Sequence, residues 1–133
     1  MRTFRAFLSG RNEVPAVRTI ATGNAVFQLS ANGTQLRFRL VVNNISRVTQ
    51  AHIHLGRRGQ NGPVVAFLFG PTKFGISVRR GVVRGVLNNR DLVGPLKGKT
   101  LLDLIREIKR GNTYVNVHTV QHPDGEIRGQ ISK

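Results

Sequence analysis

The segment NAVFQLSANGTQLRFRLVVN, residues 24–43, decides the fold class of this chain. Apolar and polar residues alternate on both sides of Asn32-Gly33, and a period of two indicates half-buried β-strands. Asn-Gly is the preferred two-residue hairpin turn, because a type I′ turn needs positive φ at both central residues. The segment therefore predicts an antiparallel hairpin whose second strand turns Arg37 and Arg39 toward solvent or toward an anion.

Similar short apolar or alternating runs, separated by segments rich in Gly, Pro and Asn, extend the pattern in both directions. They predict about eight strands, at residues 3–8, 24–30, 35–43, 48–55, 64–69, 76–87, 113–119 and 126–132. Gly81 and Gly85 interrupt the run at 76–87, and an isolated glycine inside a strand indicates a β-bulge.

One segment has helical spacing instead. Thr100 and Asp103 have the spacing of a capping box, and Gly111 suits the end of a helix. The apolar residues between them recur at helical intervals: Leu101, Leu104, Ile105 and Ile108. About eight strands and one helix inserted near residues 100–110 favour a mainly β, antiparallel Greek-key β-sandwich, immunoglobulin-like or superoxide-dismutase-like. The 133 residues predict a single domain, 1–133.

All four histidines lie in two short clusters, AHIHL at 51–55 and VHTVQH at 117–122. On a strand, His52 and His54 point to one face about 6–7 Å apart, and His118 points opposite Val117. If the two strands are neighbours, three or four imidazoles converge. Imidazole suits copper and zinc, so the predicted metal ligands are His52, His54 and His118, with His122 as a candidate fourth.

A structural role is the alternative interpretation of the same histidines. In that case the imidazoles hydrogen-bond to loop carbonyls or to polar side chains, namely Asn43, Gln50, Asn116 or Asp124. Asp124 and Glu126 are also candidates to orient an imidazole through its second nitrogen, as metal sites require. Glu126 is otherwise expected to pair with Arg128 or another cation.

The charge is strongly unbalanced: 21 Lys and Arg stand against 6 Asp and Glu, a formal net charge of +15. Sixteen of the cations are Arg, whose planar fork of donors matches carboxylate and phosphate. The expected partner is an anionic polymer or surface, bound by non-specific electrostatics, although the charge also serves solubility. The chain has no pattern of a sequence-specific nucleic-acid binder and few aromatics for stacking on bases.

Other function classes find no support. There is no cysteine, no nucleophile elbow and no clustered carboxylate pair. No run approaches the roughly 18–20 apolar residues of a transmembrane helix. Residues 1–10 have no signal-peptide h-region, so we expect a cytoplasmic protein, or one that reaches the cell or spore surface by an unusual route.

Several motifs together carry a resemblance to a known family. In chain order they are EVP at 13–15, ATG at 21–23, AHIH at 51–54, GPVV at 62–65, YVNVHT at 114–119 and HPDGEIRGQ at 122–130. This set resembles the CHRD (chordin) domain family over nearly the whole chain. The resemblance implies a β-sandwich module of the kind found in bacterial proteins and as repeats in the developmental protein chordin.

A more distant similarity is to the copper–zinc superoxide dismutases, which are Greek-key sandwiches. His52, His54 and His118 resemble copper ligands of that family, but its bridging and zinc ligands and its disulfide have no counterpart here. We therefore expect a non-enzymatic CHRD-type binding or structural module with a basic surface and one copper or zinc ion. The alternative is a mononuclear copper metalloenzyme of superoxide-dismutase-like redox type.

Overall fold

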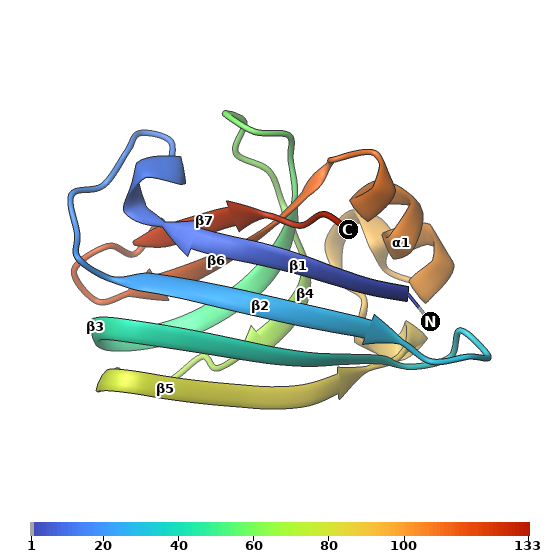
Figure 1. Ribbon diagram of the computed structural model, residues 1–133, viewed down its shortest axis with the longest axis horizontal. Coiled ribbons are helices and arrows are strands. Elements are labelled where there is room, and N and C mark those ends of the chain that lie inside the picture. The colour runs from blue at the N-terminus through green and yellow to red at the C-terminus, as the bar shows by residue number, and fades with distance from the viewer. Residues whose placement is uncertain (1) are drawn as a thin grey trace.

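The computed structural model describes residues 2–133, and antiparallel pairing joins all its strands in one sheet (Figure 1). In chain order the elements are β1 (Arg2–Ser9), η1 (Gly10–Asn12), β2 (Thr22–Leu29), β3 (Leu36–Leu55), β4 (Val64–Phe69), β5 (Ile76–Leu87), η2 (Asn89–Asp91), η3 (Gly94–Leu96), α1 (Leu101–Lys109), β6 (Thr113–Thr119) and β7 (Ile127–Gln130). The prediction of a mainly β chain with one α-helix is confirmed.

Five of the strands close into a barrel. β1 pairs with β2, β2 with β3, β3 with β6 and β6 with β7. β7 returns to β1 through the pair Ser9 and Arg128, which completes the ring. β4 and β5 extend the sheet from β3. The predicted Greek-key sandwich is not confirmed, because the pairings describe one closed sheet with two added strands.

β3 is a single strand of 20 residues where the sequence predicts two. The chain bends between its halves, where Asn44 and Arg47 adopt positive φ angles of 52° and 55° and the register to β5 shifts between Ile45 and Val48. The first half pairs with β2 and β5, and the second half pairs with β4 and β6. One strand therefore carries both the basic hairpin arm and the first histidine pair.

The glycines of β5 do not mark bulges, since the β3–β5 register runs without a shift from Arg80 to Leu87. Gly85 instead stands opposite Phe38. A Cβ on Gly85 would lie 2.7 Å from two carbons of the Phe38 ring, which is closer than packed atoms come. The glycine thus leaves the space that the Phe38 ring occupies.

Helix α1 forms as its sequence predicts. Thr100 Oγ1 accepts a hydrogen bond from the Asp103 backbone N–H, and the Asp103 carboxylate accepts one from the Thr100 N–H, so the capping box is present. The helix buries Leu101, Leu104, Ile105 and Ile108 in the same core as the barrel strands. In Figure 1 it lies near the chain ends, where β1 begins. No helix within residues 2–133 is long and apolar enough to span a bilayer.

Candidate metal centre

Strand alternation places three histidines on the outer face of the barrel. Their neighbours Ala51, Ile53 and Val117 are buried in the core, so the histidine side chains of β3 and β6 point the other way. The two strands are hydrogen-bonded neighbours, which aligns polar side chains along this face. The partners across the strands are Gln50 with His118, His52 with Asn116, and His54 with Tyr114.

His52, His54 and His118 form one compact cluster. One ring nitrogen from each lies within 4.8 Å of those of the other two. The three side chains are buried, with exposed fractions of 4%, 7% and 7%. The ring centres of His52 and His118 are 4.8 Å apart. The prediction that the two strands bring these imidazoles together is confirmed.

His122 is not part of this cluster. It is partly buried in the turn after β6, and its backbone N–H donates to Thr119 Oγ1 over 3.1 Å. The cluster is also the only group of three or more potential metal-ligating side chains found among residues 2–133.

Each clustered imidazole uses one nitrogen to donate a hydrogen bond. His54 Nδ1 donates to the Gly62 carbonyl and His118 Nδ1 to the Pro123 carbonyl, both over 2.9 Å. His52 Nε2 lies 3.0 Å from the Gln50 side-chain oxygen. An amide oxygen only accepts, so the proton of each neutral ring sits on the bonded nitrogen and the other nitrogen keeps a lone pair.

The remaining ring nitrogens are buried and have no hydrogen-bond partner among residues 2–133: His52 Nδ1, His54 Nε2 and His118 Nε2. Buried polar atoms without a partner are rare in folded proteins. Metal-ligating histidines have this arrangement, with the second N–H held by a carbonyl or carboxylate so that the lone pair is aimed at the ion.

Burial keeps the three rings uncharged. It lowers the pKa of His52 to about 3, with a further contribution from the nearby His118 and His54 rings. Burial likewise lowers the pKa of His54 to about 4, and it lowers the pKa of His118. At neutral pH the cluster therefore presents neutral imidazoles, the form that binds a metal ion.

Tyr114 supports the cluster from the neighbouring register position. Its ring stacks on His54, with centres 4.8 Å apart and planes 9° from parallel. The Tyr114 hydroxyl accepts a hydrogen bond of 3.0 Å from the Gly62 backbone N–H. Tyr114 thus holds both the His54 ring and the residue whose carbonyl orients that ring.

Arg128 holds the loop at residues 56–63, which contains Gly62, in place. Its guanidinium donates to the carbonyls of Arg57 and Gln60, over 3.0 and 2.7 Å, and to Asn61 Oδ1 over 3.0 Å. The side chain is 1% exposed, and burial lowers its pKa although the group remains a cation. A buried arginine with its fork filled by loop oxygens fixes the loop that contains Gly62.

β4 covers the cluster from the other edge of β3. The β3–β4 register shifts twice, between Ala51 and His52 and again between Ile53 and His54. Such irregularities re-aim side chains and are common beside functional sites. Here Phe67 of β4 meets His52 edge to face, with ring centres 4.6 Å apart, while 43% of the Phe67 side chain remains exposed.

Only part of the predicted polar support is present. The hydrogen bonds to loop carbonyls and to Gln50 are confirmed. Asn116 donates instead to Glu13 and to the Ile127 carbonyl. The predicted pairing of Glu126 with Arg128 is wrong. The Glu126 carboxylate accepts from three neutral side chains, Thr19, Thr119 and Gln121, and orients no imidazole.

Glu13 is a buried carboxyl that sequence reasoning missed. It is 6% exposed and accepts from Asn116 Nδ2. Burial raises the pKa of Glu13 to about 7, against the lowering effects of the Asn116 hydrogen bond and the Arg128 charge. Tyr114 shares the strand face of His118, so alternation could have identified it. Glu13 and Arg128 stand in the motifs EVP and HPDGEIRGQ, but no local spacing assigns either of them a place beside the cluster.

Comparison with known proteins identifies the family. A model of the CHRD domain family matches residues 4–131, which is nearly the whole chain. No curated protein matches the sequence.

Proposed function

The chain belongs to the CHRD domain family, and on that premise we propose that it is a non-enzymatic binding module with one metal ion. The ion is copper or zinc, and its ligands are His52, His54 and His118. The strongly basic surface of the module binds an anionic polymer.

The observation that carries the metal proposal is the set of three buried ring nitrogens without hydrogen-bond partners. Leaving three such atoms unpaired is costly, and one ion would satisfy all of them. Ligands of a tetrahedral zinc ion lie about 3.3 Å apart, given Zn–N bonds of about 2.0–2.1 Å. The three ring nitrogens lie within 4.8 Å of one another, so small movements of the rings would bring them to these ligand distances.

The ligand set is three neutral imidazoles, which suits copper and zinc and leaves one coordination position for water or a small ligand. His122 lies outside the cluster, so we leave it out of the ligand set. It serves as the matched control, since its replacement removes an imidazole from the same part of the chain.

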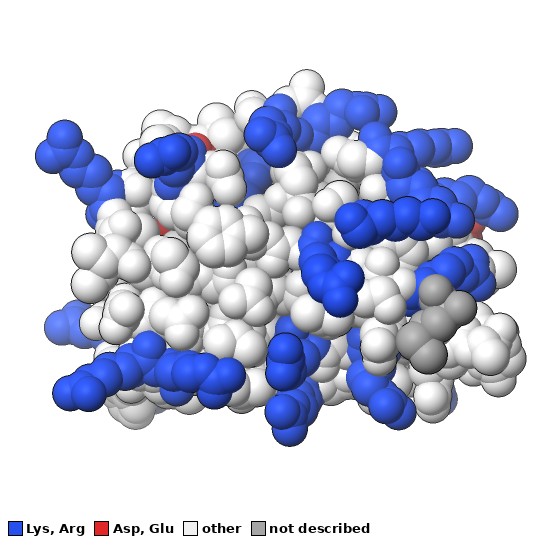
Figure 2. Space-filling model, in the orientation of Figure 1, with Lys and Arg blue, Asp and Glu red and all other residues white. Residues whose placement is uncertain are grey.

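The basic surface supports the second half of the proposal. Figure 2 shows Lys and Arg side chains spread over the face in view, with Asp and Glu visible there only as small areas. Within residues 2–133 the two ion pairs are Arg106 with Asp103 on α1 and Glu107 of α1 with Arg110, the residue that follows the helix. Most of the cations are therefore not neutralised within the protein and attract polyanions at long range.

Calorimetric titration of the chelator-treated protein with Cu²⁺ and with Zn²⁺ tests the metal site. We expect about one ion per chain, and we expect this binding to be lost in a His52→Ala, His118→Ala double variant. The single variant His118→Gln removes the ligand nitrogen but keeps a polar side chain of similar size, so it should disturb the fold less than the double variant. Circular dichroism of each variant verifies folding.

His122→Ala should bind like the unchanged protein. Weak binding, or binding that the double variant retains, would contradict the metal site and leave the imidazoles with a structural role. Copper-dependent turnover of superoxide that disappears in His52→Ala would contradict the non-enzymatic assignment. The polymer interaction is tested separately, as binding that weakens steeply with salt.

A further inference from the structure

A long stretch of the chain contains no acidic residue. Between Glu13 and Asp91 there is no Asp or Glu, whereas ten Arg and one Lys occur there. This stretch contains β2, β3, β4 and β5, none of which has an acidic side chain, and the basic side chains of these strands lie on β3 and β5. An anion at this part of the sheet meets no carboxylate from the strands themselves.

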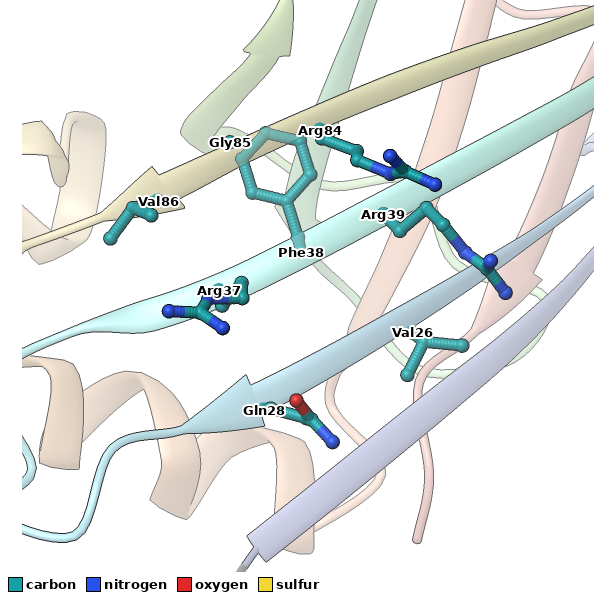
Figure 3. Close-up of a pocket in the computed structure, with 8 residues that line it drawn as sticks. All are labelled: Val26, Gln28, Arg37, Phe38, Arg39, Arg84, Gly85 and Val86. Carbon is teal, nitrogen blue, oxygen red and sulfur yellow. The ribbon is translucent and has the colours of Figure 1, made fainter.

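A groove lies on the outer face of this region, with a volume of about 540 Å³ (Figure 3). Three exposed arginines dominate it: Arg37 and Arg39 from β3, and Arg84 from β5. The remaining lining residues are Val26, Gln28, Phe38, Gly85 and Val86. Figure 3 shows Arg39 and Arg84 extending in the same direction from adjacent strands.

Two of these arginines repel each other across neighbouring strands. Arg39 and Arg84 are direct cross-strand partners, and like charges directly opposite each other destabilise a sheet. None of the three arginines has an ion pair within residues 2–133. An anion that enters the groove would offset this repulsion, and the relief of repulsion would favour binding of the anion.

The lining indicates the chemistry of the anion. A guanidinium is a planar fork that binds a planar carboxylate through two parallel hydrogen bonds. The valines add apolar surface between the charges, and Val86 is 47% exposed. The one aromatic residue, Phe38, is only 5% exposed and offers no stacking platform for bases. The occupant should therefore combine carboxylates with apolar ring faces, as sugar chains of uronic acids do.

We propose that this groove binds a linear carboxylated polysaccharide. The guanidiniums of Arg37, Arg39 and Arg84 hold its carboxylates, and Val26 and Val86 contact the C–H faces of its sugar rings. The inference rests on the anionic partner of the proposed function and adds a place and a chemical class to it. It does not depend on the metal site, which lies on the other half of β3.

Fluorescence anisotropy with a labelled oligomer of galacturonic acid, at fixed ionic strength, tests the proposal. The groove variant is Arg37→Gln, Arg39→Gln, Arg84→Gln. The matched control is Arg18→Gln, Arg58→Gln, Arg90→Gln, which removes the same charge from exposed positions outside the groove. We expect the groove variant to bind at least about tenfold more weakly, and the control less than about threefold, since isolated surface charges contribute little.

Equal weakening in both variants would overturn the groove while leaving a non-specific basic surface. The unchanged protein should also prefer the uronate oligomer to linear polyphosphate and to an oligothymidine of similar charge. A preference for either of these would overturn the sugar assignment. Absence of binding to all three polymers would overturn the inference and the anionic partner of the proposed function together. Circular dichroism confirms that the glutamine variants keep the fold.

Discussion

The guanidinium of Arg128 lies 3.5 Å from the centre of the Tyr114 ring, and that ring stacks on His54. Cation, phenol and imidazole thus form one continuous set of contacts. The same guanidinium fixes the loop that contains Gly62, the residue whose carbonyl orients His54. Arg128 therefore positions His54 through both its stacking partner and its hydrogen-bond acceptor.

Arg128→Lys tests this relationship, because lysine keeps the charge but has no fork to hold three loop oxygens. We expect the free energy of unfolding to fall by about 2–3 kcal/mol. We also expect metal affinity to fall on the order of tenfold, as for other residues that orient a ligand. Urea denaturation and metal titration measure the two effects. Arg58→Lys, exposed in the same loop, should change neither, and an unchanged metal affinity in Arg128→Lys would refute the positioning role.

The buried histidines predict acid sensitivity of the metal-free protein. In the unfolded chain a histidine takes up a proton near its ordinary pKa of about 6.5. In the folded chain the pKa of His52 is about 3 and that of His54 about 4, so between these values and 6.5 only the unfolded state is protonated. The contribution of each neutral ring to the free energy of unfolding is complete above pH 6.5. Below pH 6.5 this contribution falls by about 1.4 kcal/mol per pH unit for each such histidine.

Urea unfolding at pH 7 and at pH 5, with chelator present, measures this loss. A His54→Gln variant lacks one of the titrating rings and should lose less stability over the same interval. If the variant and the unchanged protein show the same pH slope, burial of neutral His54 is not the cause.

Glu13 predicts the opposite pH dependence. Its pKa is raised to about 7, so the folded state holds a proton that the unfolded state releases near 4.5. The contribution of the protonated Glu13 to the free energy of unfolding is complete below pH 4.5, and it is lost as the pH rises through 7. Glu13→Gln imitates the protonated carboxyl and can still accept from Asn116. We expect the variant to be more stable than the unchanged protein at pH 8, by up to about 3 kcal/mol. The gain should shrink toward pH 5, and a gain that is constant with pH would contradict the assignment.

The repulsion between Arg39 and Arg84 predicts a stabilising substitution. Arg84→Thr removes one of the two like charges and places a good strand former on an exposed position. The expected gain is about 0.2–1 kcal/mol at low salt, and it should vanish near 1 M salt, where charges are screened within a few ångströms. Arg80→Thr is the control, because Arg80 stands opposite the neutral Asn43. Equal gains from both substitutions would argue against a specific repulsion.

Local patterns account for most of what the sequence predicts correctly. Alternation locates the strands, and it places His52, His54 and His118 on faces that do meet. The capping box at Thr100 and Asp103 locates the helix within one residue of its observed start. Both features depend on a few neighbouring residues, so the period of apolar residues and the capping residues predict them directly.

What the sequence does not predict depends on contacts distant in the chain. Arg128 holds oxygens of residues 57–61 from about 70 positions away, and no local pattern marks it as a partner of His54. The continuity of β3 depends on Asn44 and Arg47 adopting left-handed angles that Gly usually takes. Closure of the barrel depends on the distant pair Ser9 and Arg128, which strand alternation does not mark, so the pattern of separate strands predicts a sandwich instead.

The position of the histidines outside the barrel has a kinetic consequence. They lie beneath two surface loops and Phe67, whereas the core strands pair behind them. If the proposed ion binds here, its entry requires local opening of the covering loops and not unfolding of the barrel. Loading should not have to wait for synthesis or refolding of the chain. The occupancy of the proposed site would then follow the concentration of free metal ions around the folded protein.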